Sequence, residues 1–252
     1  MTLIFRSSLI ALAGACALAT PLPAGAADAA IAKISDDLQI RQLAPGVWMH
    51  TSWNTLPTGM RYPSNGLLVR EDQGCLLIDT AWGEAPTRSL LDWIDRELHL
   101  RVVRAIVTHA HDDRMGGAAV LVERHIPFSS HPLTRVLAAK KHWPAPETIP
   151  GIEAAGSAVT SGTVEIFYPG PAHTPDNIMV WIPQAKILFA GCAVKDAPAR
   201  NLGNVEDADL ANWPRAIRRT QQRYPEAKVV VPGHGEPGAA ELLQHTLDLC
   251  RP

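Results

Sequence analysis

The sequence predicts an α/β fold in which two β-sheets pack face to face and helices cover their outer surfaces. Strand patterns are followed by a helical pattern in the first half of the chain, and the second half repeats this order. Several strands that precede polar motifs are continuously apolar, which is typical of strands buried in a layered α/β protein. The composition, 46% hydrophobic and 19% charged over 252 residues, is that of an ordinary globular protein.

The first 26 residues have the pattern of a secretory signal peptide. Arg6 gives the N-terminus a positive charge, residues 9–19 form a short apolar core, and residues 24–26 are Ala-Gly-Ala, a small-residue cleavage site. Cleavage is expected after Ala26, which predicts a periplasmic or secreted protein. A membrane helix is the alternative, but the apolar run is shorter than a bilayer requires.

The rest of the chain is expected to form one domain of residues 27–252, with halves at roughly residues 27–145 and 146–252. Lipid attachment at Cys16 is a further alternative, but Ala13 stands where such signals usually carry leucine. The formal net charge is −2 and no basic stripe occurs, so nucleic acid is not expected as a partner. We expect a monomer without stable membrane association.

The first half is predicted to contain several strands and one helix. Alternating or apolar segments predict strands at residues 38–43, 47–51, 65–69, 75–79 and 102–108. The last of these is interpreted as a continuous apolar strand that ends directly at His109, and it is expected to be buried on both faces. Residues 53–63 predict an exposed hairpin or mobile loop, and the spacing of leucines over residues 86–98 predicts a helix.

The second half repeats the pattern. Strands are predicted at residues 164–168, 178–182, 187–190 and 228–231, and helices at residues 209–224 and 238–249. No short repeat or low-complexity linker divides the chain.

One polar motif, Thr108 to Gly117, follows the buried strand of the first half. His109, His111 and Asp113 alternate in it, so an extended or loop backbone would point all three side chains the same way. Two imidazoles and a carboxylate form a zinc half-site when they converge. The alternative is a polar turn at the surface.

Three further segments favour the metal site. His173, Cys192 and His234 each lie just past a predicted strand and are flanked by glycine or proline. Beyond the signal peptide the chain has three cysteines, Cys75, Cys192 and Cys250, so at least one thiol has no intramolecular partner in an oxidising compartment. Metal ligation would use such a thiol, and Cys75 is expected to be a buried apolar residue.

With these motifs the chain resembles the metallo-β-lactamases of subclass B1. Residues 204–210 and 232–235 are particularly similar to the VIM group. The resemblance implies an αβ/βα sandwich of two mixed β-sheets, with two zinc ions per chain in a shallow groove at the sheet edges. It assigns the first zinc to His109, His111 and His173, and the second to Asp113, Cys192 and His234.

The resemblance also implies the activity. A zinc-bound hydroxide would attack the β-lactam amide of penicillins, cephalosporins and carbapenems without a covalent intermediate, which confers antibiotic resistance. Lys195 would bind the substrate carboxylate, Asn204 would lie near the carbonyl oxygen, and Asp113 would orient the nucleophile. A solvated surface lysine and a turn asparagine are the alternatives for the first two residues.

Arg114 and Cys192 distinguish the chain from glyoxalase-II-like relatives, which usually have histidine and a bridging aspartate there. A thioesterase or lactonase on the same fold and a non-catalytic zinc-binding protein are the rival functions. Asp79 and Arg114 are expected to support the ligands through hydrogen bonds, although Asp79 could be purely structural. Four side chains could form an apolar wall or simply pack: Trp53, Met60, Tyr62 and Trp82. No chemistry is assigned to six histidines: His50, His99, His125, His131, His142 and His245.

Overall fold

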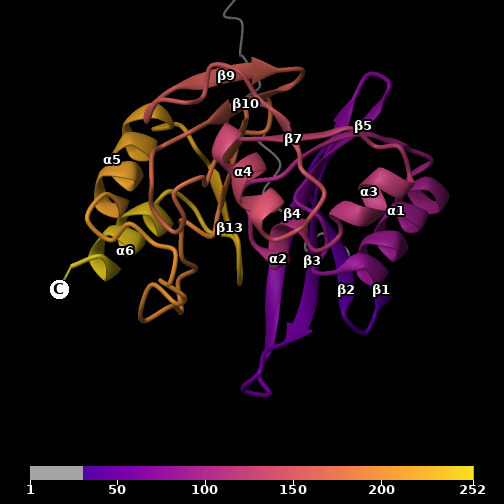
Figure 1. Ribbon diagram of the computed structural model, residues 1–252, viewed down its shortest axis with the longest axis horizontal. Coiled ribbons are helices and arrows are strands. Elements are labelled where there is room, and N and C mark those ends of the chain that lie inside the picture. The colour runs from indigo at the N-terminus through magenta and orange to yellow at the C-terminus, as the bar shows by residue number, and fades with distance from the viewer. Residues whose placement is uncertain (1–30, 252) are drawn as a thin grey trace, which may run out of the picture.

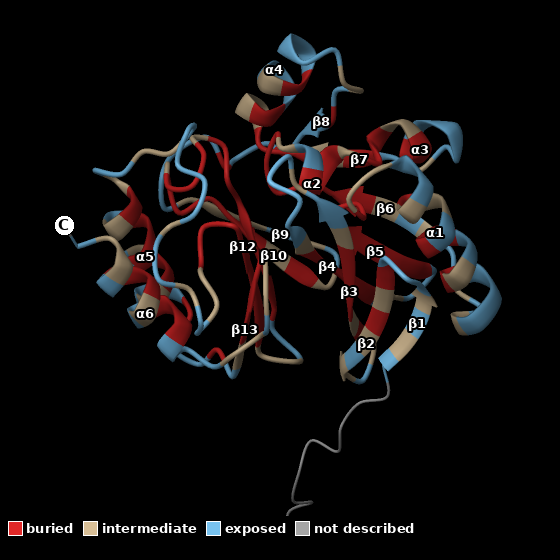
Figure 2. Ribbon diagram, turned by 90° about the horizontal axis from the view of Figure 1, so that it is seen from below, coloured by how far each residue is buried: buried red, intermediate tan, exposed pale blue. Residues whose placement is uncertain are grey.

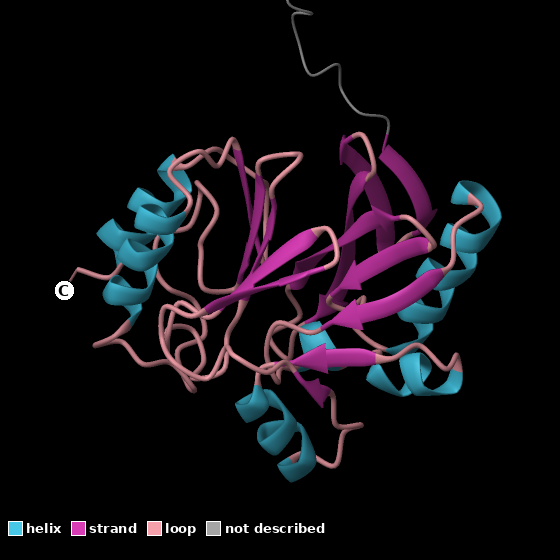
Figure 3. Cartoon of the chain, turned by 90° about the horizontal axis from the view of Figure 1, so that it is seen from above, coloured by secondary structure: helices cyan, strands magenta, loops and turns pink. Residues whose placement is uncertain are grey.

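Two β-sheets face each other in the computed structural model, which describes residues 31–251 (Figure 1). Helices lie on the two outer sides of the pair of sheets (Figure 3). The predicted two-sheet α/β fold is therefore confirmed. The predicted signal peptide at residues 1–26 lies outside the described residues.

The first sheet has eight strands in sequence order. Its strands β1 to β5 are antiparallel neighbours, and β5 to β8 are parallel, so the sheet is mixed. The strands are β1 (Ile31–Ser35), β2 (Leu38–Ala44), β3 (Val47–Thr55), β4 (Arg61–Glu71), β5 (Gly74–Ile78), β6 (Val102–Ile106), β7 (Phe128–Ser130) and β8 (Glu147–Thr148).

The second sheet has five strands in the order β13-β12-β11-β10-β9. The pair β12 and β13 is parallel and the other pairs are antiparallel, so this sheet is also mixed. The strands are β9 (Ala158–Ser161), β10 (Val164–Phe167), β11 (Met179–Ile182), β12 (Ile187–Gly191) and β13 (Val229–Pro232).

Helices α1 (Glu84–Leu98) and α3 (Ala118–Glu123) cover the first sheet, and α5 (Trp213–Arg223) and α6 (Glu241–Leu249) cover the second (Figure 1). The predicted helix at residues 86–98 is confirmed, because α1 buries the apolar face formed by Leu90, Leu91 and Ile94. Short helix α2 (Asp112–Met115) follows β6, and α4 (Pro132–Lys140) follows β7. Within residues 31–251, no helix is long and apolar enough to cross a membrane.

Three apolar clusters fill the layers, and buried segments run through both sheets (Figure 2). One lies beneath α1 and α3, one lies between the sheets, and one lies beneath α5 and α6. The middle cluster joins strands from both halves of the chain through side chains such as Leu67, Ile78, Ile166, Phe189 and Val231. Burial of this apolar surface holds the two sheets face to face.

The segment at residues 53–63 is a hairpin, in which β3 and β4 continue to the pair Thr55 and Arg61. It projects from the first sheet (Figure 1). The expectation that residues 102–108 are buried on both faces is wrong for the start of β6. There the strand pairs with β5 alone, because β7 pairs with β6 only from Ala105 onward; Val103 is 37% exposed, and Arg104 pairs with Glu71.

Two helices begin later than predicted. α5 begins at Trp213 rather than residue 209, because Asp209 accepts a hydrogen bond from the Asn212 backbone and forms a turn before the helix. α6 begins at Glu241 rather than residue 238, because Gly238 forms a bridge with Val230 of β13. The pattern of the sequence did not predict β1, α3, β7, α4, β8 and β9.

Candidate metal centre

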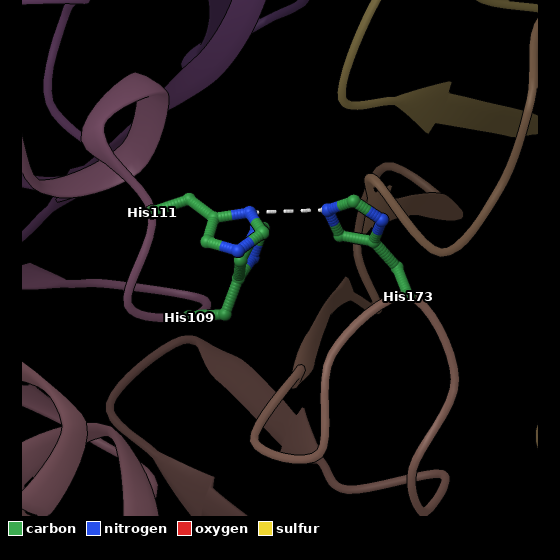
Figure 4. A group of neighbouring side chains, drawn as sticks. All are labelled: His109, His111 and His173. Atoms are coloured by element: carbon green, nitrogen blue, oxygen red, sulfur yellow. Dashed lines mark hydrogen bonds between the residues drawn. The ribbon is translucent and has the colours of Figure 1, made fainter. Parts of the chain in front are cut away.

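Six candidate ligands come from segments that end at one edge of the two sheets. His109 and His111 follow β6, His173 lies between β10 and β11, and Cys192 and His234 follow β12 and β13. The sixth, Asp113, lies in α2. Figure 4 shows His109 and His111 on one loop and His173 approaching from the loop opposite.

Three histidines form the first group. The Nδ1 atom of His111 lies 3.2 Å from Nε2 of His173, and one nitrogen of each of the three side chains lies within 4.8 Å of the others. The Nε2 atom of His109 is buried and has no hydrogen-bond partner among the described residues. A buried ring nitrogen that faces two other imidazoles needs a cation or proton between them, because burial without a partner is costly.

A carboxylate, a thiol and an imidazole form the second group. The Cys192 Sγ atom lies 3.3 Å from Nε2 of His234 and 3.6 Å from Oδ2 of Asp113, and Nε2 of His234 lies 3.3 Å from the same oxygen. The expectation that Asp113 points the same way as His109 and His111 along an extended backbone is wrong. Helix α2 begins at Asp112, and this turn carries Asp113 into the second group.

Hydrogen bonds set the tautomers of three of the histidines. The Thr108 hydroxyl donates to Asp79 and therefore accepts from Nδ1 of His109 at 3.2 Å, which leaves the lone pair on Nε2. His234 donates from Nδ1 to the Pro63 carbonyl at 2.6 Å, and His111 donates from Nε2 to Asp207 at 2.9 Å. Each lone pair therefore lies on the nitrogen that faces the other candidate ligands, as metal ligation requires.

Burial sets the charges of the two groups. It lowers the pKa of His109 and His173 well below the ordinary value and that of His234 to about 4, so these imidazoles are neutral. Burial alone would raise the pKa of Asp113, but Arg114 outweighs it and keeps the carboxylate ionised. Burial raises the pKa of the Cys192 thiol, so a thiolate there needs a cation beside it. Neutral imidazoles with a carboxylate and a cysteine form a donor set that fits zinc.

The comparison with known proteins follows this geometry. The family model of the metallo-β-lactamase superfamily matches residues 59–234. The chain belongs to this superfamily. A metallo-β-lactamase type 2 from Bacillus sp. (strain 170) is 41% identical over 218 residues, which cover 85% of this chain and 82% of the relative.

Solved structures of metallo-β-lactamases also match. That from Pontibacter korlensis is 44% identical with a TM-score of 0.78, over 84% of this chain and 98% of that one. The FIM-1 enzyme from Pseudomonas aeruginosa, crystallised in a mono-zinc form, is 33% identical with a TM-score of 0.81, over 86% of this chain and 97% of that one.

In this metallo-β-lactamase a buried arginine joins the segments of the second group. Arg114 donates from Nε and Nη2 to Oδ2 of Asp113, at 2.9 and 2.7 Å, and from Nη2 to the carbonyl of Gly233 at 2.8 Å. Its Nη1 donates to the carbonyl of Asn65 at 2.5 Å and to Asp79 at 3.3 Å. A fully buried guanidinium whose donors are all used fixes the orientation of the groups around it.

Asp79 lies beneath the loop that carries His109. Its carboxylate accepts from the Thr108 backbone at 2.7 Å and from the Thr108 hydroxyl at 2.9 Å. Burial raises the pKa of Asp79 to about 6 against the opposing effect of Arg114. Asp79 also has a positive φ of 60°, a conformation rare for residues other than glycine, asparagine and aspartate. The backbone therefore turns at Asp79, where the Asp79 side chain contacts the loop that carries His109.

A cleft of about 350 Å³ adjoins the second group, and its lining includes Tyr62, Lys195, Arg200 and His234. The Lys195 ammonium lies 5.3 Å from the centre of the Trp213 ring, and burial lowers the pKa of Lys195. Asn204 is exposed on the following loop, and its Oδ1 accepts from the Glu206 backbone. Its amide nitrogen is thus available as a donor.

The structure divides the four side chains proposed as an apolar wall. The rings of Tyr62 and Trp82 lie 4.8 and 6.5 Å from the His234 ring. Trp53 instead lies beneath Arg61, 4.6 Å away, and Met60 is 54% exposed in the hairpin. The sequence patterns also assigned no role to Asp207, which accepts a hydrogen bond from His111. A carboxylate in an exposed turn carries no local signal of a partner almost a hundred residues away.

Proposed function

We propose that this chain hydrolyses the amide bond of β-lactam antibiotics with two zinc ions. The observation that carries the proposal is the convergence of two three-donor groups with preset histidine tautomers. Three protein ligands for each zinc leave a coordination position for water, as in catalytic zinc sites and unlike closed structural sites. The mono-zinc form of the FIM-1 relative supports zinc as the metal.

We assign the first zinc to His109, His111 and His173 and the second to Asp113, Cys192 and His234. Asp79 and Arg114 support these ligands through the contacts described above. When bound in such a site, zinc lowers the pKa of water from 15.7 to about 7 and so supplies a nucleophile at neutral pH.

The chain's own side chains then bind and orient the substrate. Lys195, beside the cleft next to His234, binds the carboxylate that β-lactams carry near the reactive amide. Asn204 donates from its amide nitrogen to the carbonyl oxygen as negative charge develops there. Asp113 remains ionised against Arg114 and orients the water, so no protein nucleophile and no covalent intermediate are needed.

Finer features belong to the same proposal. Arg114 and Cys192, with the motifs at residues 204–210 and 232–235, favour subclass B1 and the VIM group within it. We propose activity on penicillins, cephalosporins and carbapenems, and hence antibiotic resistance. The pattern of residues 1–26 supports export to the periplasm. We also propose a monomer without stable membrane association.

The test is turnover by the purified, zinc-loaded protein. We expect close to two zinc ions per chain by metal analysis, and hydrolysis of a chromogenic cephalosporin and of a carbapenem that a chelator abolishes and added zinc restores. A thioester and a lactone serve as comparison substrates and should react far more slowly. Absence of chelator-sensitive turnover of both β-lactams would contradict the proposal, as would preferred hydrolysis of the thioester or the lactone.

A further inference from the structure

Ala110, between His109 and His111, has a hydrogen bond to a charged side chain at each of its two peptide groups. The Ala110 N–H donates to Oδ2 of Asp176 at 2.9 Å, and the Ala110 carbonyl accepts from Nζ of Lys141 at 2.7 Å. Ala110 is 2% exposed and Asp176 is fully buried. Among residues 31–251, Lys141 is the donor that satisfies this buried carbonyl.

Lys141 is itself held in place at the C-terminal end of α4. Its backbone N–H bonds to the carbonyls of Leu137 and Ala138, and its ammonium lies 5.0 Å from the centre of the Trp143 ring. At the other end of α4, the Thr134 hydroxyl donates to the same Asp176 oxygen that holds Ala110, at 2.8 Å. Helix α4 and its C-terminal end therefore contact the loop that carries His109 and His111 at two points, directly through Lys141 and indirectly through the buried carboxylate of Asp176.

We propose that Lys141 is a positioning residue for the three-histidine group, and this inference rests on the proposed zinc function. The two peptide groups on either side of Ala110 determine where the chain places His109 before it and His111 after it. Because the N–H of the first group and the carbonyl of the second are each bound to a charged side chain, rotation of either group breaks a charge-assisted hydrogen bond. The two imidazoles thus take their ligating positions before any metal arrives.

Loss of the ammonium would leave a buried carbonyl without a partner. The loop would then rotate to hydrate that carbonyl, and His109 and His111 would lose their common direction. Mutation of a residue that supports a metal ligand typically lowers metal affinity by about 10- to 100-fold. Because Lys141 acts through the backbone of the loop, we expect a loss at the lower end of this range, roughly tenfold.

The experiment compares Lys141→Met, which keeps the length and removes the charge, with Lys141→Arg and with Lys140→Met. Lys140 is the adjacent lysine; it is exposed, as Lys141 is, but has no side-chain hydrogen bond among the described residues, so it controls for the loss of one positive charge. The readouts are zinc affinity by chelator competition and the absorption spectrum of the cobalt(II) form. Cobalt in either group gives visible ligand-field bands, whereas only cobalt bound to the Cys192 thiolate gives a near-ultraviolet charge-transfer band.

For Lys141→Met we expect a roughly tenfold loss of affinity at the histidine group, with altered ligand-field bands and an unchanged thiolate band. Lys141→Arg should restore most of the affinity, and Lys140→Met should match the wild type. Equal behaviour of Lys141→Met and Lys140→Met, or failure of Lys141→Arg to restore affinity, would overturn the proposal. A wild-type protein that binds no zinc would instead contradict the proposed function, so the two failures are distinguishable.

Discussion

At the scale of single residues, contacts from distant parts of the chain hold the candidate ligands in place. Among these supports the sequence predicted Asp79 and Arg114 but not Asp207 or Asp176. His173, Cys192 and His234 each follow a strand beside glycine or proline, which is a local signal. By contrast, Asp207, Asp176 and the Pro63 carbonyl act on residues far away in the chain, and only the folded chain brings them together. A pattern in the sequence finds positions at strand ends, but it cannot pair a carboxylate with a distant imidazole.

Arg114 provides the residue-scale prediction. Lysine keeps the charge but has three donors in place of five, so the Arg114→Lys side chain cannot serve all of the buried oxygens that the guanidinium binds, on Asp113, Asp79, Asn65 and Gly233. We expect the free energy of unfolding of the zinc-free protein to fall by about 2–3 kcal/mol. Affinity for the second zinc should fall roughly tenfold, because Oδ2 of Asp113 loses the pair of guanidinium donors that orients it.

Urea unfolding and zinc titration measure the two effects. Arg88→Lys is the matched control, since Arg88 is a half-exposed arginine that pairs with the surface residues Glu84 and Glu123. If Arg114→Lys unfolds at the same urea concentration as Arg88→Lys, the buried guanidinium does not hold the site.

At the scale of elements, the periodicity of apolar residues predicted the long strands and helices but not the short ones. Strands β7, β8 and β9 have two to four residues, too few to show alternation. Helix α4 did carry a signal, because Pro132 lies in its first turn and His131 accepts from the Leu133 backbone as its cap. That signal matters, since α4 brings Lys141 to the metal loop.

The end of α1 gives a prediction at this scale. His99 caps the helix in the left-handed region, with φ 52°, and its N–H bonds to the Ile94 carbonyl. Glycine adopts this conformation without the steric cost that a side chain carries, although it loses more entropy on folding. His99→Gly should therefore raise the free energy of unfolding by about 0.5 kcal/mol, and His99→Val should lower it by about 1 kcal/mol. Thermal melts of both variants measure this, and a destabilised glycine variant would refute the argument.

At the scale of the whole molecule, the two sheets are held together by the apolar cluster between them and by a cluster of polar contacts around Arg104. Arg104 of β6 donates from Nε to Glu71 of β4 at 2.9 Å, and from Nη1 and Nη2 to Ser161 of β9 at 2.9 and 3.0 Å. Arg104 precedes His109 by five residues along β6 and its continuation, so this cluster lies away from the ligands. The apolar cluster between the sheets was predictable from the strand patterns, whereas this contact between sheets was not.

The cluster should make the stability of the molecule depend on pH. The hydrogen bond from Arg104 lowers the pKa of Glu71 in the folded protein. A group whose folded pKa is depressed contributes stability above its unfolded pKa, about 4.3, and loses that contribution as the pH falls through the folded value. Glu71→Gln should thus cost about 1 kcal/mol at pH 7 and progressively less below pH 4. Unfolding in urea across this pH range measures the difference, with Glu97→Gln, from an exposed pair, as the control. A cost for Glu71→Gln that is independent of pH would contradict this prediction and would mean that Glu71 acts through its shape alone. The turnover of β-lactams by Glu71→Gln at pH 7 should equal that of the wild type, because the polar cluster contacts none of the candidate ligands.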